Sequence, residues 1–171
     1  FLQMFGIKQA IVNTHHLGEQ IVDYISKNKF NLTINIVEEK NKILDTGGGI
    51  LNAIHYFSKE PFLIINPDTI WNSSYLEELK HMEKIFFENK KNKCFLLLVN
   101  KEKSFDKFIK GDFALKNNLI TRSKDDKLEY IYTGLQIIKP DVFNNLNYKV
   151  FSVNKIWDKL ITNKELNGLE S

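Results

Sequence analysis

Two neighbouring stretches decide the fold: residues 43–54, ILDTGGGILNAI, and residues 62–71, FLIINPDTIW. In the first stretch Thr46 can cap a helix, and the three glycines after it would let backbone amides approach a ligand without side chains in the way. The second stretch begins with four apolar residues, which predict a buried strand, and leads through a turn-prone Asn-Pro pair to a carboxylate at Asp68. In an open α/β sheet the carboxyl end of such a strand faces the ligand crevice. We therefore expect both stretches to border one site.

Length and composition limit the class of protein. With 171 residues, of which 43% are apolar, the chain can bury a real core, and we expect residues 1–171 to form a single domain. The 24 basic and 21 acidic residues are scattered, which is too balanced for a nucleic-acid-binding surface. No apolar run approaches the roughly 20 residues that span a bilayer, so we expect no membrane partner. The single cysteine, Cys94, cannot form an internal disulfide, which favours a reducing cytoplasm.

Apolar runs alternate with helical patterns along the first hundred residues. The runs predict strands at 7–13, 32–37, 62–65 and 94–99, and the helical spacing predicts helices at 17–27, from Gly47, and at 73–87. Later residues predict a small hairpin at 113–121, a strand at 130–138, a helical turn at 140–143 and a helix at 153–161. The pattern is typical of an α/β protein with three α/β/α layers, in which a mostly parallel central sheet carries a small antiparallel addition.

Both stretches also allow a second, purely structural interpretation. The three glycines can form a ligand loop or a tight strand-to-helix turn, and they fit neither the dinucleotide fingerprint nor a P-loop. Asp68 can bind Mg²⁺, which prefers oxygen ligands, or it can cap the turn that follows. The chain has only one arginine, Arg122, so we expect phosphate to be held by backbone amides, lysines, a metal or residues outside this chain.

Three other motifs also allow both a functional and a structural interpretation. His15 and His16 can serve metal or acid-base chemistry, although capping of the helix at 17–27 is the favoured interpretation. Residues 111–113, Gly-Asp-Phe, can present backbone to a ligand or begin a hairpin. Gly134 can mark the close approach of a ligand or only a β-bulge.

Five segments appear in an order that resembles a known family. They are residues 13–21 (NTHHLGEQI), 45–50 (DTGGGI), 62–71 (FLIINPDTIW), 111–113 (GDF) and 133–137 (TGLQI). Together they resemble sugar-1-phosphate nucleotidyltransferases, above all the N-acetylmuramate-1-phosphate uridylyltransferase type and then the mannose-1-phosphate guanylyltransferase type. The resemblance implies a Rossmann-like fold and a cytoplasmic enzyme of nucleotide-sugar and cell-wall biosynthesis. Such an enzyme transfers a nucleoside monophosphate from a nucleoside triphosphate (NTP) to a sugar 1-phosphate, which gives a nucleotide sugar and pyrophosphate.

The resemblance also implies roles for individual residues. Asp68 would be the catalytic residue and the metal ligand that holds the cofactor Mg²⁺ on the triphosphate. The residues that bind the nucleotide would be Thr46, Gly47, Gly48, Gly49 and Asn66. The residues on the sugar side would be Gly111, Asp112, Glu129, Thr133 and Gly134. The partners would be two small-molecule substrates, the NTP and the sugar 1-phosphate.

Two features of the family match no residue of this chain. The family's glycine-rich loop with its arginine would precede Phe1, and its second metal-binding aspartate would follow Ser171. Residues 1–6 also resemble the end of a helix closed by Gly6. We therefore expect a fragment truncated at both ends that has little or no turnover by itself. The alternative is a catalytically inactive nucleotide- or sugar-binding module of the same fold.

Overall fold

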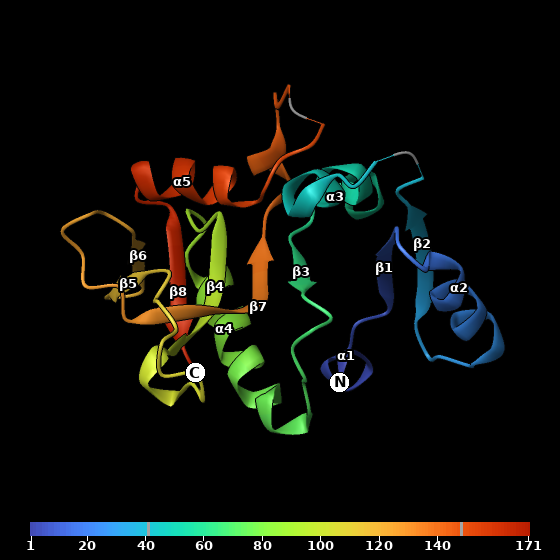
Figure 1. Ribbon diagram of the computed structural model, residues 1–171, viewed down its shortest axis with the longest axis horizontal. Coiled ribbons are helices and arrows are strands. Elements are labelled where there is room, and N and C mark those ends of the chain that lie inside the picture. The colour runs from blue at the N-terminus through green and yellow to red at the C-terminus, as the bar shows by residue number, and fades with distance from the viewer. Residues whose placement is uncertain (41, 148) are drawn as a thin grey trace.

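The strands of the computed structural model, which describes residues 1–40, 42–147 and 149–171, lie in two groups. A parallel pair, β1-β2, lies beside β3, the edge strand of a six-stranded sheet of order β3-β7-β4-β8-β6-β5 (Figure 1). The strands are β1 Gln9–Thr14, β2 Thr33–Glu38, β3 Phe62–Ile65, β4 Cys94–Asn100, β5 Ala114–Lys116, β6 Leu119–Thr121, β7 Tyr130–Ile138 and β8 Leu166–Glu170.

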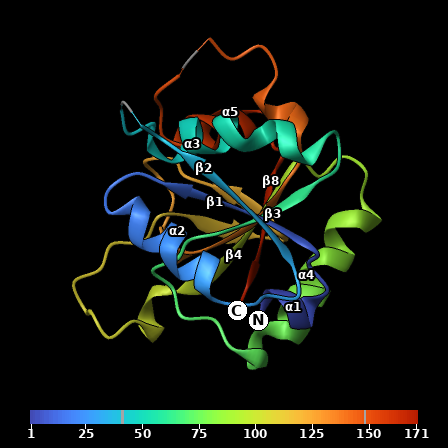
Figure 2. The same cartoon turned by 90° about the vertical axis from the view of Figure 1, so that its right-hand side faces the viewer.

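Helices cover both faces of the larger sheet. Figure 2 shows α3 and α5 on one side of the strands and α1 and α4 on the other. The α-helices are α1 Leu2–Phe5, α2 Gly18–Lys27, α3 Asp45–Ala53, α4 Leu76–Glu88 and α5 Asn154–Thr162. The 3-10 helices are η1 Ile54–Phe57, η2 Ser73–Tyr75, η3 Lys101–Lys103 and η4 Pro140–Phe143. None of the helices in the described parts of the chain has the length and apolar character that crossing a bilayer requires.

The central strand β4 explains the two-sided core. Its side chains alternate between the faces of the sheet, so Leu96 and Leu98 pack with α5 whereas Phe95 and Leu97 pack with α4. All four residues are at most 1% exposed, as expected for a strand that is covered on both faces. The predicted three-layer α/β class is confirmed.

The strand directions correct one detail of the prediction. The sequence predicts a mostly parallel sheet with a small antiparallel addition, and the hairpin β5-β6 is that addition. However, β7 lies between β3 and β4 and is antiparallel to both of them, so antiparallel pairing also occupies the middle of the sheet. Among the described strands, only β1 with β2 and β4 with β8 pair in parallel.

Two further differences have local causes. The sequence gives no strand signal for β8, because Asn167 and Gly168 interrupt it. A Cβ on Gly168 would lie 2.7 Å from the Ile120 Cδ1 atom and 3.0 Å from the Leu96 carbonyl oxygen, so the glycine allows β8 to pack closely here. The run at 7–13 is predicted to be buried, but residues 10–12 are only half-buried, because β1 pairs with β2 alone among the described strands. The prediction that Gly6 closes a helix is confirmed: Gly6 has a φ of 96° and ends α1.

Candidate functional site

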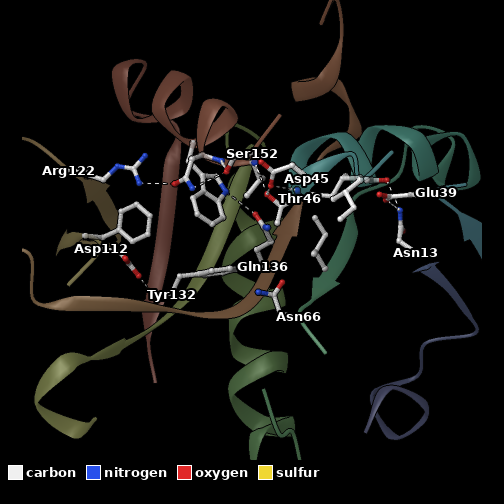
Figure 3. Close-up of a pocket in the computed structure, with 18 residues that line it drawn as sticks. Asn13, Glu39, Asp45, Thr46, Asn66, Asp112, Arg122, Tyr132, Gln136 and Ser152 are labelled. Atoms are coloured by element: carbon white, nitrogen blue, oxygen red, sulfur yellow. Dashed lines mark hydrogen bonds between the residues drawn. The ribbon is translucent and has the colours of Figure 1, made fainter. Parts of the chain in front are cut away.

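A cavity of about 700 Å³ lies between α3, the segment before α5 and one face of the sheet (Figure 3). Cavities of this size hold small-molecule ligands. Asn13 lies near the carboxyl end of β1, Glu39 follows β2 and Asn66 follows β3, and in α/β sheets this is the side where ligands bind. The polar lining residues are Asn13, Glu39, Asp45, Thr46, Asn66, Asp112, Arg122, Tyr132, Gln136, Ser152 and Asn154, and the others are Ile43, Gly49, Ile50, Ile64, Phe113, Val153 and Trp157.

The first turn of α3 is hydrogen-bonded to residues 149–153, the segment that leads into α5. The Gly48 amide donates to the Phe151 carbonyl oxygen (3.0 Å), and the Phe151 amide donates to the Leu44 carbonyl oxygen (3.1 Å). The Val153 amide donates to the Thr46 hydroxyl oxygen (2.9 Å). The prediction that Thr46 caps the helix is therefore wrong. The N-cap is Leu44, which makes no side-chain capping bond, and Thr46 lies inside α3 and contacts the segment before α5 instead.

The three glycines allow this close approach. A Cβ on Gly47 would lie 2.4 Å from the Phe151 ring, and one on Gly48 would lie 2.4 Å from the Lys149 carbonyl oxygen. Real Cβ atoms do not come this close to other heavy atoms, so only glycine fits at these two positions. Gly47 and Gly48 are buried against the chain itself, and Gly49 is the one glycine of the three that lines the cavity. The nucleotide-binding role of Gly47 and Gly48 stays a prediction.

The α3 end of the cavity is rich in amide and carboxylate groups. The Asn13 side-chain amide donates to a Glu39 carboxylate oxygen (3.2 Å) and to the Gly49 carbonyl oxygen (3.0 Å). The second Glu39 carboxylate oxygen accepts from the Leu44 amide (2.9 Å). Asp45 has a left-handed φ of 62°, a strained conformation for a residue with a side chain, and its carboxylate accepts from the Thr46 amide (2.6 Å).

The histidines next to this end do not cap α2. The N-cap of α2 is Leu17, with a φ of 53° and no side-chain capping bond, so the capping interpretation is wrong. The Nδ1 atom of His15 lies 2.5 Å from the Glu39 carbonyl oxygen instead, and His16 is exposed. His15 therefore helps to hold the chain after β2.

The other end of the cavity is aromatic and carries the single arginine. The Trp157 ring packs edge-on against Phe113 (centroids 5.8 Å apart) and Tyr132 (4.9 Å). The Arg122 guanidinium lies over the Phe113 ring, 5.2 Å from its centroid, donates to the Asn154 side-chain oxygen (2.8 Å) and pairs with Asp158. The sequence singles out Arg122 but does not place it in the site, because the contacts that bring it there come from α5.

Tyr132 is the titratable group of this cavity whose pKa changes most clearly. Burial raises the pKa of Tyr132 well above its ordinary value, and the nearby Cys94 acts in the same direction. Its hydroxyl oxygen is buried and has no hydrogen-bond partner among the described residues. The phenol therefore stays protonated at neutral pH and can donate a hydrogen bond.

Of the five residues predicted on the sugar side, only Asp112 lines the cavity. Its carboxylate accepts from the Tyr132 amide (3.0 Å). Gly111 packs against the backbone of Leu128, because a Cβ would lie 2.1 Å from the Leu128 carbonyl oxygen, which fits the start of a hairpin. Glu129 forms an ion pair with Lys127 (2.5 Å).

Thr133 and Gly134 hold the loop that follows β3. The Thr133 hydroxyl donates to the Leu97 carbonyl oxygen (2.8 Å), and the Thr133 carbonyl oxygen accepts from the Thr69 hydroxyl (2.9 Å). Gly134 has a φ of 90° and lies where the register of β4 and β7 shifts, so it marks a β-bulge. A Cβ on Gly134 would lie 2.9 Å from the Asn66 Cβ, so the glycine lets the loop with Asn66 approach.

Asp68 lies outside the cavity lining, two residues beyond Asn66. It is exposed, and its carboxylate makes no hydrogen bond or ion pair with the described residues. The turn that follows is capped by Asn72, whose side chain accepts from the Ser74 amide (2.8 Å). Within residues 1–40, 42–147 and 149–171, no group of three or more His, Cys, Asp or Glu side chains could hold a metal ion. Asp68 thus offers a single free carboxylate for a metal.

The architecture is the Rossmann-like α/β fold of the nucleotidyltransferases, and solved structures with this fold cover 99% of the chain. A putative glucose-1-phosphate thymidylyltransferase from Bacillus anthracis, in complex with a sucrose, is 17% identical, with a TM-score of 0.76 and 70% of its own chain covered. An inositol-1-phosphate CTP transferase from T. maritima is 16% identical, with a TM-score of 0.72 and 69% covered. HddC from Yersinia pseudotuberculosis, complexed with GMP-PN, is 18% identical, with a TM-score of 0.70 and 72% covered.

The chain is also similar in sequence to a named enzyme. The N-acetylmuramate alpha-1-phosphate uridylyltransferase of Caulobacter vibrioides is 24% identical over 169 residues, which cover 96% of this chain and 69% of the relative. No family model matches the chain. The resemblance to sugar-1-phosphate nucleotidyltransferases that the motifs predict is confirmed by these similarities.

The substitution Gly48→Ala tests the close approach of α3 and residues 149–153. An alanine inside a helix normally stabilises it by up to about 1 kcal/mol relative to glycine. Here the new Cβ would force the backbone of Lys149 to move, so we expect a net loss of about 1–3 kcal/mol in the free energy of unfolding, measured in urea. The matched control is Asn52→Ala, an exposed position on the same helix, which we expect to stay within about 0.5 kcal/mol. Unchanged stability of the Gly48 variant would contradict the packing described above.

Proposed function

We propose that the protein transfers a nucleoside monophosphate from an NTP to a sugar 1-phosphate and releases pyrophosphate. The observation that carries the proposal is that Thr46, Gly49 and Asn66, which belong to the segments resembling the nucleotidyltransferases, line one cavity. The uridylyltransferase from Caulobacter vibrioides matches 96% of the chain, which supports the same reaction class. Such a reaction consumes an NTP, so we propose a cytoplasmic role in nucleotide-sugar biosynthesis that supplies the cell wall.

The α3 end of the cavity suits a nucleobase better than a phosphate. The Gly48 amide is bonded to Phe151 and the Thr46 amide to the Asp45 carboxylate, so these two amides of the first turn are not available to an anion. The acidic side chains of Glu39 and Asp45 would repel phosphate but can accept hydrogen bonds from a base. The apolar side chains of Ile43 and Ile50 add surface on which a flat ring can pack.

The aromatic end suits the sugar 1-phosphate. The Arg122 guanidinium has five N–H groups, and its bonds to Asn154 and Asp158 leave others for an anionic oxygen. With the base at α3 and the sugar phosphate near Arg122, the attacking phosphate oxygen and the α-phosphorus would meet in the middle of the cavity. In-line phosphoryl transfer depends on such positioning more than on a protein nucleophile.

The proposed reaction would use Mg²⁺ bound to the triphosphate. Mg²⁺ in nucleotide sites takes one or two carboxylates and completes its shell with water and phosphate oxygens, and Asp68 offers one carboxylate without a partner. When bound, the ion would neutralise charge on the triphosphate. We propose Asp68 as its ligand from the protein.

The direct test measures pyrophosphate. The protein to assay is extended by whatever residues its gene encodes before Phe1 and after Ser171. When it is given uridine triphosphate, Mg²⁺ and a panel of sugar 1-phosphates, we expect it to release pyrophosphate only when both substrates are present. Residues 1–171 alone should give little or no release, because the resemblance places the glycine-rich loop before Phe1. Brisk release by residues 1–171 would refute this second expectation. Nucleotide binding without release from any sugar by the extended protein would favour the inactive binding module.

The substitution Asp68→Asn tests the proposed metal ligand. It removes the negative charge and keeps the shape, so we expect Mg²⁺-dependent turnover of the extended protein to fall by at least about a hundredfold without loss of thermal stability. Asp125→Asn, at another exposed carboxylate, is the matched control and should leave turnover unchanged. Undiminished activity of the Asp68 variant would remove Asp68 from the metal site.

A further inference from the structure

Two phenylalanines of one loop are fully exposed to solvent. Phe105 is 105% exposed and Phe108 is 93% exposed, more than any other large apolar side chain among the described residues. Both belong to residues 104–110, which we call the aromatic loop, and none of these residues lines the cavity described above. A phenyl ring gains free energy when it leaves water, so a pair of exposed rings on one loop indicates an interaction surface.

The aromatic loop is held in shape by its own hydrogen bonds. The Asp106 amide donates to the Ser104 hydroxyl oxygen (3.2 Å), and the Phe108 amide donates to the Asp106 carboxylate (2.9 Å). The Lys107 ammonium group donates to the Ser104 carbonyl oxygen (2.9 Å). The turn therefore presents both rings to solvent in a fixed arrangement, which lowers the entropy cost of binding a partner.

The base of the aromatic loop is fixed to the rest of the fold on both sides. Before the loop, the Lys101 ammonium group donates to the Leu128 carbonyl oxygen (3.1 Å). After it, the Asp112 amide donates to the Tyr130 carbonyl oxygen (2.7 Å), and Phe113 is fully buried. Figures 1 and 2 show the segment between η3 and β5 at the end of the molecule opposite to α3 and α5. The two rings thus project from a rigid support.

The two rings are surrounded in sequence by lysines. Residues 101–110 contain four lysines and two acidic residues, an excess of two positive charges. Phe105 lies between Lys103 and Lys107, and Phe108 lies between Lys107 and Lys110. These three lysines are exposed, and the Lys110 ammonium group makes no hydrogen bond or ion pair with the described residues. The surface is therefore both apolar and cationic.

The lysines distinguish between two kinds of partner. Protein interfaces are enriched in phenylalanine but depleted in lysine. The surface of a membrane with anionic lipids attracts lysine and accepts apolar rings at the boundary between head groups and acyl chains. The long stem of a lysine lets its ammonium group stay among the head groups while a neighbouring ring goes deeper. The combination of charges and rings therefore fits an anionic lipid surface best.

We propose that the aromatic loop binds the protein to the surface of a membrane that contains anionic lipids. Phe105 and Phe108 insert between the lipid head groups, and the lysines of residues 101–110 contact the acidic head groups. Two rings and a few lysines give weak and reversible binding. The sequence-based expectation of no membrane partner rests on the lack of a spanning segment, which binding through a surface loop does not require. This proposal goes beyond the proposed function and does not depend on it.

The test measures sedimentation of the extended protein with lipid vesicles. We expect binding to vesicles of phosphatidylcholine and phosphatidylglycerol in equal amounts, little binding to phosphatidylcholine alone, and release at high salt. The double variant Phe105→Ser/Phe108→Ser should bind the anionic vesicles at least about tenfold more weakly. Equal binding by the double variant, or no binding by the unaltered protein, would overturn the proposal.

Two single variants test the rings and the charges separately. Phe87→Ser is the matched control, because Phe87 is another exposed phenylalanine (56%) that is followed by two lysines, Lys90 and Lys91, but lies on α4. It should leave vesicle binding unchanged. Lys110→Gln should weaken binding to the anionic vesicles about fivefold. A loss in Phe87→Ser as large as that of the double variant would show that the aromatic loop has no special role.

Other occupants of the aromatic loop give different results without vesicles. The double variant should have the melting temperature of the unaltered protein, because the replaced rings are exposed. A clear drop would mean that residues before Phe1 or after Ser171 cover the rings. Self-association that the double variant loses would mean that a second copy covers them. Either result would overturn the proposal.

The vesicle experiment is independent of the enzyme assay. Vesicle binding requires no turnover, so an inactive protein still tests the role of the aromatic loop. Failure to bind vesicles, in turn, leaves the proposed nucleotidyltransferase function in place.

Discussion

The contact between the first turn of α3 and residues 149–153 is the constraint on which the site depends. Three hydrogen bonds hold these segments together, and two glycines without side chains let the backbones meet. The contact places α3 and the start of α5 over the same face of the sheet, where they cover the cavity. A Cβ at position 47 or 48 would push these segments apart and change the shape of the site before any ligand arrived.

The cavity has two chemically different ends, which suits the two substrates of the proposed reaction. Glu39 and Asp45 give the α3 end acceptor groups, whereas Arg122 and the rings of Phe113 and Trp157 give the other end a cation and apolar faces. The floor between them is formed by β7, an antiparallel strand in the middle of the sheet, which carries Tyr132 and Gln136. The fold thus places the acceptors Glu39 and Asp45 at one end of the cavity and the donor Arg122 at the other.

Local signals predict the elements but not the long-range contacts. The apolar run at 62–65 and the long strand at 130–138 coincide with β3 and β7, because strand propensity is expressed within a few residues. The sequence shows three glycines but cannot show that Phe151 and Lys149 lie against two of them, about a hundred residues away. Arg122 reaches the cavity through contacts with α5 that no local pattern encodes. Gln136, by contrast, is recognisable in the sequence as the single polar residue within the apolar run 135–138.

The central claim is that this cavity binds a nucleotide at one end and a sugar at the other, and the melting temperature tests it most directly. A ligand that binds only the folded chain at a hundredfold excess over its Kd stabilises it by about 2.7 kcal/mol, which raises the melting temperature by several degrees. For the extended protein with Mg²⁺, the account predicts such a rise with an NTP and with the corresponding nucleotide sugar, and a smaller rise with the nucleotide sugar in Gly48→Ala. No change with any nucleotide or nucleotide sugar would contradict the account.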